Sequence, residues 1–525
     1  MMKEMDFKDV EDINRGHRRT TMPAASSSRT APRTNSSDRL YKGMVLIVVA
    51  FCVVLIIVST SHTTIVNVSS SSSLNGGRGG RGSSKKIEML RDFKQQQQPP
   101  KPKPKSIQQQ DHPPYHMVFS TSCNDQQHWE SYVFFYHTNK VGQPGTVTRI
   151  CSGCSDKEAR ALQDFHDRHI KTMNPSFFLH LTPDFGQLMK KQKLGAQTAY
   201  KYMNKPYGLK HWMDNILKMN ETTSATSSSV EDGIVFLLDP DMILFRPLVH
   251  DFTNEDVMWV THKDQQQPRT KIVKHGYPIA QQDGYLTNQW MGLNASFITD
   301  GGNINNIPSK DGPIHWNTGP PYIATVKDMY QIASLWCDYA PRVYHIHPKL
   351  FAEMFGYIYA TTQLDLPHTL IKSIVISNTE TNREGWPYID NLAETDICDT
   401  PSDSALPVGL HYCKRYMLEK WFFSKYRLKK KYISCESPLL EPPPTDLATR
   451  NHSVAYAPPP HGHNVKEQPW ESEAKQIKPW RAKREAFMLC HLITKINEAA
   501  KFWKEQNCGD NGNYEYYNLH DDPNH

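Results

Sequence analysis

Asp239 and Asp241 flank Pro240 directly after the apolar run IVFLL, residues 234–238. In α/β sheets ligands gather at the carboxyl ends of strands, so a strand at this run would deliver both acids to a site. Alternate residues of an extended chain point to opposite sides, and Pro240 favours a turn that lets the two carboxylates converge. Carboxylate oxygens suit Mg²⁺ or Mn²⁺. We therefore predict that the pair binds one divalent cation; a plain Asp-Pro-Asp turn is the alternative.

Segments with strand and helix periodicity alternate around these acids. YHMVFSTSC and PSFFLHLTP read as strands, and KPYGLKHWMDNIL reads as a helix. This alternation predicts an α/β domain over residues 114–435. A Pro-rich linker, 436–470, follows it. The apolar stripe of a predicted helix at about 471–505 indicates that the C-terminal extension, 471–525, docks on the domain.

Fifteen consecutive apolar residues, Met44–Val58, interrupt a polar N-terminus. With uncharged flanks, residues 43–61 reach the ~20 residues that a membrane-spanning helix requires. Lys and Arg crowd the N-terminal side, so the positive-inside rule predicts a signal anchor with residues 1–42 as a cytosolic tail. A cleaved signal peptide is the alternative, although its charged leader is usually shorter. Residues 62–113, rich in Ser, Gly, Gln and Pro, read as a low-complexity stalk.

This topology would place most cysteines and all the glycosylation motifs in the lumen. Nine of the ten cysteines follow the apolar run, so we expect disulfides, with at least one cysteine unpaired or bonded between chains. Cys151 and Cys154 could form half a zinc site, but no second pair with suitable spacing follows, which favours disulfide bonding. The predicted N-glycosylation sites are Asn67, Asn220, Asn294 and Asn451.

The composition argues against nucleic acid as a partner. The chain has 525 residues and a net charge of only +6, from 60 basic and 54 acidic residues that are dispersed along it. A hydrophobic content of 38% is consistent with one good core plus disordered segments.

Five stretches resemble the plant and algal peptidyl glycosyltransferases, namely the hydroxyproline O-arabinosyltransferases and the peptidyl serine α-galactosyltransferases. They are VFSTSCNDQQHWESYVFFYHTNKVGQPGTVTRICSGC, NKPYGLKHWM, LLDPDMILFRPL, AEMFGYIYATTQLDLPH and LHYCKRY, and they span Tyr115 to about Lys431. The resemblance implies a GT-A-like nucleotide-diphospho-sugar transferase domain, a UDP-sugar donor and Mn²⁺ (or Mg²⁺) dependence. It also implies transfer of galactose or arabinose to Ser or hydroxyproline hydroxyls of secreted or cell-wall glycoproteins. The expected location is the Golgi or endoplasmic-reticulum membrane, with one transmembrane helix in the bilayer and the catalytic domain in the lumen.

The resemblance assigns Asp239 and Asp241 to the family's Asp-x-Asp motif. It makes His411 a candidate third metal ligand or diphosphate contact, because a neutral imidazole suits Mn²⁺. Glu353 lies on a largely apolar predicted helix, where burial raises a carboxyl pKa, and is a catalytic acid/base candidate; a surface glutamate is the alternative. The candidates for donor or acceptor binding are Asn288, Trp290, Asn317 and Lys210. Loop packing explains the first three equally well, and solvated helix charges are the commoner role for Lys210 and for Lys205.

Two other classes of function stay open at this stage. One is a non-catalytic lumenal sugar-binding or scaffold protein with a degenerate GT-A fold, and the other is a glycoside hydrolase, which needs two carboxyls ~5–10 Å apart. The intact acid pair favours the transferase. The metal hypothesis would fail if Asp239 and Asp241 pointed apart, or lay buried against cations with no cleft beside them. As a test we expect Asp241→Asn to abolish transfer and to leave the melting curve nearly unchanged.

Overall fold

The computed structural model describes residues 112–187, 200–221, 228–261, 267–283, 286, 288–302, 310–450, 455–456, 474–475 and 477–519. All of them belong to one compact unit, from Gln110 to the C-terminal end. The predicted tail (1–42), anchor (43–61) and nearly all of the stalk (62–113) lie outside the described residues.

The predicted fold class needs a correction, because it included a transmembrane helix. No helix in the described ranges is long and apolar enough to cross a bilayer. The longest one, Pro479–Asn507, carries Lys, Arg and Glu side chains throughout its length. The described residues therefore form a mixed α/β body, with no transmembrane helix among them.

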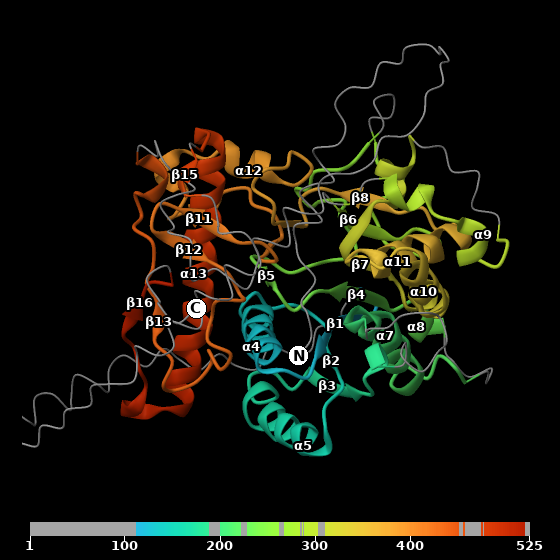
Figure 1. Cartoon of the computed structure of the whole chain (residues 1–525), viewed down its shortest axis with the longest axis horizontal. Helices are drawn as coiled ribbons and strands as arrows, with labels where there is room; N and C mark the ends of the chain where they lie inside the picture. Colours follow the sequence, from blue (N-terminus) through green and yellow to red (C-terminus); the bar gives the residue numbers. More distant parts are fainter. Residues whose placement is uncertain are drawn as a thin grey trace, which may run out of the picture. The chain divides into compact units, whose positions relative to one another are not determined.

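A seven-stranded mixed sheet forms the centre of this body, in the order β3-β2-β1-β4-β7-β6-β8 (Figure 1). Its strands are β1 (Tyr115–Ser122), β2 (Thr146–Ser152), β3 (Phe177–Thr182), β4 (Ile234–Leu238), β6 (Ile279–Gln282), β7 (Thr318–Thr325) and β8 (Thr369–Ile371). Strands β3, β2, β1 and β4 run parallel, β7 runs antiparallel to both β4 and β6, and β8 is parallel to β6. The parallel half brings the carboxyl ends of β1 and β4 to the same edge.

Helices cover both faces of the sheet, so the sheet separates two hydrophobic cores. They include α4 (Asp125–Lys140), α5 (Asp156–Phe165), α7 (Asn204–Asn215), α8 (Ser228–Glu231), α9 (Ala295–Ile298), α10 (Val326–Ile346), α11 (Ala352–Gln363), α12 (Trp386–Asp390) and α13 (Pro479–Asn507). Side chains of a strand alternate between faces, so Met117 and Phe119 of β1 join the core that contains residues of α4 and α13. Val118 joins the other core, with residues of α7, α10 and α11.

The C-terminal helix shares the first of these cores with the rest of the body. Phe487, Leu492 and Ile496 of α13 are fully buried there. The helix begins at Pro479 rather than near residue 471, in agreement with the preference of proline for the first helical position. Part of the predicted linker is also ordered, because β13 (Leu439–Leu440) pairs with β16 (Tyr516–Tyr517).

The remaining strands form short sheets beside the main one. They are β5 (Met242–Leu244), β9 (Val375–Ile376), β10 (Gly409–His411), β11 (Tyr416–Leu418), β12 (Trp421–Phe423), β14 (Ala455–Tyr456) and β15 (Ala474–Lys475). Among these, β5, β10 and β9 form a three-stranded sheet next to the carboxyl end of β4.

Three disulfides link Cys123 with Cys154, Cys398 with Cys490 and Cys435 with Cys508. The last two tie the C-terminal extension to the body. Of the described cysteines, Cys151, Cys337 and Cys413 are free thiols. The pairing of Cys154 with Cys123 removes the zinc alternative for the Cys151-Ser-Gly-Cys154 segment.

Candidate active site

The backbone brings His411 to the two aspartates. Asp239, Pro240 and Asp241 form the connection between β4 and β5, and β5 pairs antiparallel with β10 so that His411 lies opposite Met242. The next residue of the chain continues this contact, because the Tyr412 N–H donates to the Asp241 carbonyl oxygen at 2.9 Å. His411 is 170 residues from Asp241 in sequence (411 minus 241), so this strand pairing creates the cluster.

The three side chains converge as a metal site requires. His411 Nε2 lies 3.2 Å from Asp241 Oδ1 and 3.9 Å from Asp239 Oδ2. The candidate ligand atoms of the three residues all lie within 4.8 Å of one another. Two carboxylate oxygens and one imidazole nitrogen are a donor set that suits Mn²⁺ or another divalent cation. The residues present therefore fit such an ion.

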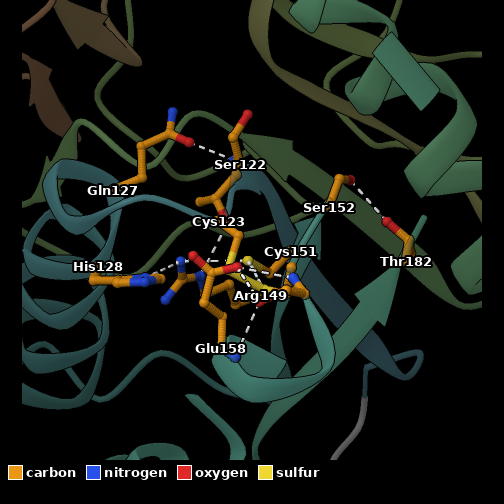
Figure 2. The surroundings of a disulfide bond; sticks show 12 residues. Ser122, Cys123, Gln127, His128, Arg149, Cys151, Ser152, Glu158 and Thr182 are labelled. Atoms are coloured by element: carbon orange, nitrogen blue, oxygen red, sulfur yellow. Dashed lines mark hydrogen bonds between the residues drawn. A yellow bond between two sulfur atoms is a disulfide. The ribbon is translucent and has the colours of Figure 1, made fainter. Parts of the chain in front are cut away.

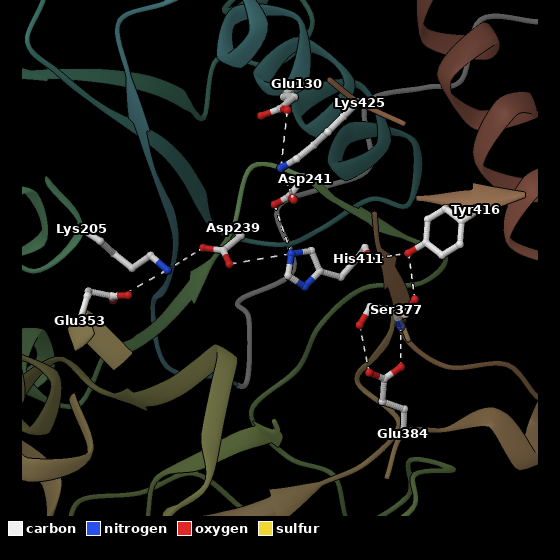
Figure 3. Close-up of polar contacts among 10 residues, drawn as sticks. All are labelled: Glu130, Lys205, Asp239, Asp241, Glu353, Ser377, Glu384, His411, Tyr416 and Lys425. Atoms are coloured by element: carbon white, nitrogen blue, oxygen red, sulfur yellow. Dashed lines mark hydrogen bonds and ion pairs between the residues drawn. The ribbon is translucent and has the colours of Figure 1, made fainter. Parts of the chain in front are cut away.

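Two largely buried lysines bind the outer oxygens of the same aspartates (Figure 3). Lys205 Nζ lies 2.8 Å from Asp239 Oδ1, and Lys425 Nζ lies 2.6 Å from Asp241 Oδ2. Each aspartate thus gives one oxygen to a lysine and turns the other toward His411. Because a charge-assisted hydrogen bond fixes the rotation of a carboxylate, the lysines orient the inner oxygens.

Each lysine also approaches a second, buried carboxylate. Lys205 Nζ is 3.9 Å from Glu353 Oε1 on α11, and Lys425 Nζ is 3.8 Å from Glu130 Oε1 on α4. The side chains form one continuous series, from Glu353 through the lysines, aspartates and His411 to Glu130, drawn in Figure 3.

Burial and charge shift the ionisation of this series in opposite directions. Burial raises the pKa of Glu353 to about 7, although Lys205 opposes the rise. Burial likewise raises the pKa of Glu130 to about 7, against the attraction of Lys425. Burial also disfavours the charged form of Asp241, but Lys425 and His411 outweigh this effect and lower its pKa. The pKa values of these carboxylates therefore differ: Asp241 is ionised, whereas Glu353 and Glu130 titrate near neutral pH.

A cleft of about 300 Å³ opens beside the cluster. Asp239, Asp241, His411, Lys205 and Glu353 all contribute to its lining. Other lining side chains come from the end of β1, from β6 and from the segment before α12: Ser122, Asn124, Gln281, Asp283 and Glu384. Asp241 is thus buried and Asp239 partly buried against cations, but both face an open cavity large enough for a small polar ligand.

The predicted donor- or acceptor-binding residues lie elsewhere. None of Asn288, Trp290, Asn317 and Lys210 lines the cleft. Trp290 Nε1 donates to Asn317 Oδ1 at 3.0 Å in the buried interior, and Asn288 packs against Gly312. Lys210 Nζ pairs with Asp214 at 2.7 Å on α7. Their polar groups hold loops and a helix in place, so this placement does not support binding roles for them.

The predicted glycosylation sites are partly described. Asn220 and Asn294 are exposed, whereas Asn67 and Asn451 lie outside the described residues. Asn294 also caps α9, because its Oδ1 accepts from the Phe297 N–H at 3.1 Å.

Sequence reasoning missed the two lysines and Glu130, whereas it did nominate Glu353. It interpreted Lys205 as a solvated charge, yet the Lys205 side chain is only 14% exposed. Lys425 lies in a basic stretch of the sequence, and nothing in that context distinguishes it from the neighbouring basic residues. Glu130 did carry a signal: it stands next to Trp129 in a segment whose helical face is aromatic, where an acid needs a partner.

Comparisons with known proteins confirm the resemblance over part of the chain. No family model matches the sequence. The chain is 23% identical, over 281 residues, to a protein from Arabidopsis thaliana named peptidyl serine alpha-galactosyltransferase. The match covers 50% of this chain and 28% of the relative, so the chain spans little more than a quarter of that protein's length.

Similar solved structures are distant. Two of them are structures of LgtC: one is an active-site mutant, and the other is the galactosyltransferase in complex with donor and acceptor sugar analogues. Each is 10% identical to this chain with a TM-score of 0.30, and the match covers 57% of this chain and 87% of the LgtC chain. A third is the apo bifunctional glycosyltransferase WbbM, with 11% identity and a TM-score of 0.29 over 59% of this chain and 47% of that one. At these TM-scores the likeness is too weak to assign a fold.

Proposed function

We propose that this protein is a metal-dependent glycosyltransferase that moves a sugar, galactose or arabinose, from a UDP donor to Ser or hydroxyproline hydroxyls of secreted polypeptides. The single observation that carries the proposal is the convergence of Asp239, Asp241 and His411 on one point beside an open cleft. The partial match to a peptidyl serine alpha-galactosyltransferase supports the choice of chemistry.

The cluster has the charge distribution that a diphosphate leaving group requires. Asp239, Asp241 and His411 would hold the cation, Mn²⁺ or Mg²⁺, which when bound neutralises negative charge on a departing diphosphate. The lysines orient the aspartates by binding their outer oxygens, and Lys425 lowers the pKa of Asp241. Because these contacts exist before any ligand arrives, little reorganisation accompanies binding.

Glu353 is placed to handle the acceptor proton. Glu353 lines the cleft, and burial raises its pKa to about 7, which is close to the optimum for a group that must exchange a proton near neutral pH. Glu353 Oε1 accepts no hydrogen bond within the described structure, although Lys205 lies 3.9 Å away. That oxygen is buried, so an acceptor hydroxyl would have to reach Glu353 from the cleft that it lines.

The three disulfides support an oxidising location. We propose the lumen of the Golgi or endoplasmic reticulum, where serine and hydroxyproline acceptors of secreted proteins are found. Detection of high-mannose or processed glycans on the exposed Asn220 or Asn294 would support this location, and an unglycosylated native protein would count against it.

The decisive experiment is transfer by the purified full-length protein. It would be incubated with a panel of UDP-sugars and with Ser-rich or hydroxyproline-rich peptides, with and without Mn²⁺, and free UDP and glycosylated peptide would be measured. We expect both products from one donor, only with the cation. Sugar binding without UDP release would instead support the alternative of a non-catalytic sugar-binding or scaffold protein.

A further inference from the structure

Three cysteine sulfurs meet at the carboxyl ends of β1 and β2 (Figure 2). Cys123 follows β1 and is bonded to Cys154, while the free thiol of Cys151, the penultimate residue of β2, lies 3.7 Å from Cys154 Sγ. The turn that returns the chain from Cys151 to Cys154 requires Gly153, whose φ is +83°. A thiol thus lies within van der Waals contact of a disulfide sulfur.

The thiol has a buried cation beside it. Arg149 Nη2 lies 3.6 Å from Cys151 Sγ, and the side chain of Arg149 is almost fully buried. Its other hydrogen bonds go to Thr121 Oγ1 at 2.9 Å and to His128 Nδ1 at 2.8 Å. In the part of the chain that the structure describes, Arg149 forms no ion pair with a carboxylate.

His128 is a neutral hydrogen-bond partner of Arg149. Burial and the neighbouring guanidinium lower the pKa of His128 to about 4, so the imidazole is neutral and accepts from Arg149. A thiol reacts with a disulfide as its thiolate, so the proton of Cys151 must leave before attack. The Cys151 thiol is thus placed between the guanidinium and the disulfide, 3.6 Å from Arg149 Nη2 and 3.7 Å from Cys154 Sγ.

We propose that Cys151, Cys154 and Cys123 form a thiol–disulfide exchange site. The Cys151 thiolate attacks Cys154 Sγ, a Cys151–Cys154 bond forms, and the Cys123–Cys154 bond breaks. The electron pair leaves on Cys123 Sγ, which then takes up a proton equivalent to the one that Cys151 lost. The number of thiols and disulfides is unchanged, so no oxidant or reductant is needed.

Exchange would alter the wall of the cleft. Ser122 and Asn124, the neighbours of Cys123, both line the cleft, and Asn124 caps α4 by accepting from the Gln127 N–H at 2.9 Å. The disulfide with Cys154 ties this corner to the end of β2. Once Cys123 is released, the corner loses this covalent tie and keeps non-covalent ones such as the hydrogen bond from Cys123 N–H to the Ser152 carbonyl at 3.0 Å.

The two states differ in which thiol a reagent can reach. Cys151 is fully buried, whereas Cys123 is partly exposed. Native alkylation should therefore trap Cys123 rather than Cys151, and each trapped molecule should carry a Cys151–Cys154 bond. Both cysteines of that bond fall in the tryptic peptide ICSGCSDK, residues 150–157, so the exchanged form is an intact peptide two hydrogens lighter than its dithiol.

The test is to incubate the native full-length protein with iodoacetamide at pH 8, quench in acid, unfold, block the remaining thiols with N-ethylmaleimide and map the peptides without reduction. We expect carbamidomethyl groups on Cys123, together with the internally bonded 150–157 peptide. In Cys151→Ser the labelling of Cys123 should fall at least about tenfold, because the attacking thiolate is gone. The matched control Cys413→Ser removes another free thiol and should leave the labelling of Cys123 unchanged.

Two results would overturn the proposal. One is wild-type protein in which Cys123 stays unlabelled while Cys123 and Cys154 remain bonded throughout. The other is equal labelling of Cys123 in wild type and Cys151→Ser, which would mean that the disulfide opens by another route. The wild-type peptide map decides the matter even if Cys151→Ser folds poorly, and neither result depends on the proposed transferase activity.

Discussion

Replacement of Asp241 by Asn tests both the chemistry and the electrostatics of the site. The substitution keeps the size of the side chain but removes the charge that faces Lys425 at 2.6 Å and His411 at 3.2 Å. Transfer should fall at least about 100-fold, the usual cost of removing one preorganised electrostatic group. The expectation from sequence, that the melting curve stays nearly unchanged, needs revision because the Asp241 side chain is only 5% exposed.

The stability cost follows from the partners that remain. Removing one member of a buried ion pair costs about 3–5 kcal/mol, because the other charge stays buried without compensation. In Asp241→Asn, Glu130 remains 3.8 Å from Lys425 and partly compensates its charge. The expected loss of unfolding free energy is therefore at the lower end of this range, about 3 kcal/mol. The matched control is Asp164→Asn, which breaks an exposed pair with Arg168 on a helix surface and should cost about 0.5 kcal/mol or less.

Urea unfolding of Asp241→Asn, Lys425→Met and the double variant measures this coupling. Since the double variant leaves neither charge of the pair unpaired, its loss of stability should be smaller than the sum of the two single losses by about 1–3 kcal/mol. The reasoning is refuted if Asp241→Asn retains transfer in Mn²⁺. It is also refuted if the free energy of unfolding of Asp241→Asn falls no further than that of the Asp164→Asn control.

Three further predictions concern other parts of the body. Glu353→Gln should lower kcat at least about 100-fold, with Mn²⁺ binding by calorimetry retained, because Glu353 lies outside the proposed ligand set; an unchanged kcat would remove it from the reaction. Trp290→Phe should cost about 1–3 kcal/mol by leaving Asn317 Oδ1 unsatisfied, with no change in the donor KM; a raised KM would restore Trp290 to the binding site. Burial lowers the pKa of His368 to about 3 from an ordinary 6.5, so its contribution to stability is complete above pH 6.5 and is lost as the pH falls toward 3. Urea unfolding should therefore show about 2–3 kcal/mol more loss between pH 6.5 and 4.5 in wild type than in His368→Gln, and parallel pH profiles would contradict this pKa.

Local periodicity predicted many of the elements around the site. The strand that ends at Leu238, the strand that begins at Tyr115 and the helix that contains Lys205 were all visible in the sequence, because period-2 and period-3.6 patterns depend on residues a few positions apart. Their boundaries were less certain. The C-terminal helix was expected from about residue 471 and begins at Pro479, where a proline can start a helix but not sit inside one.

The resemblance supplied what periodicity could not. It nominated His411, which the β5–β10 pairing then places beside the acids. It could not identify Trp290 and Asn317 as a buried hydrogen-bonded pair. Amide and aromatic residues in turn-rich stretches occur both in packed loops and in binding sites, and the sequence does not distinguish the two.

The sequence by itself determined that two aspartates stand where a buried strand ends, and that an α/β body surrounds them. Only the tertiary structure decided which charges meet those aspartates: Lys425 is 184 residues from Asp241, and Glu130 reaches the same lysine from a helix near the start of the body. The physical reason is the separation along the chain over which each effect acts. Strand and helix patterns arise from neighbours along the chain, whereas the ionisation and orientation of a buried carboxylate depend on side chains that folding brings to within a few ångströms.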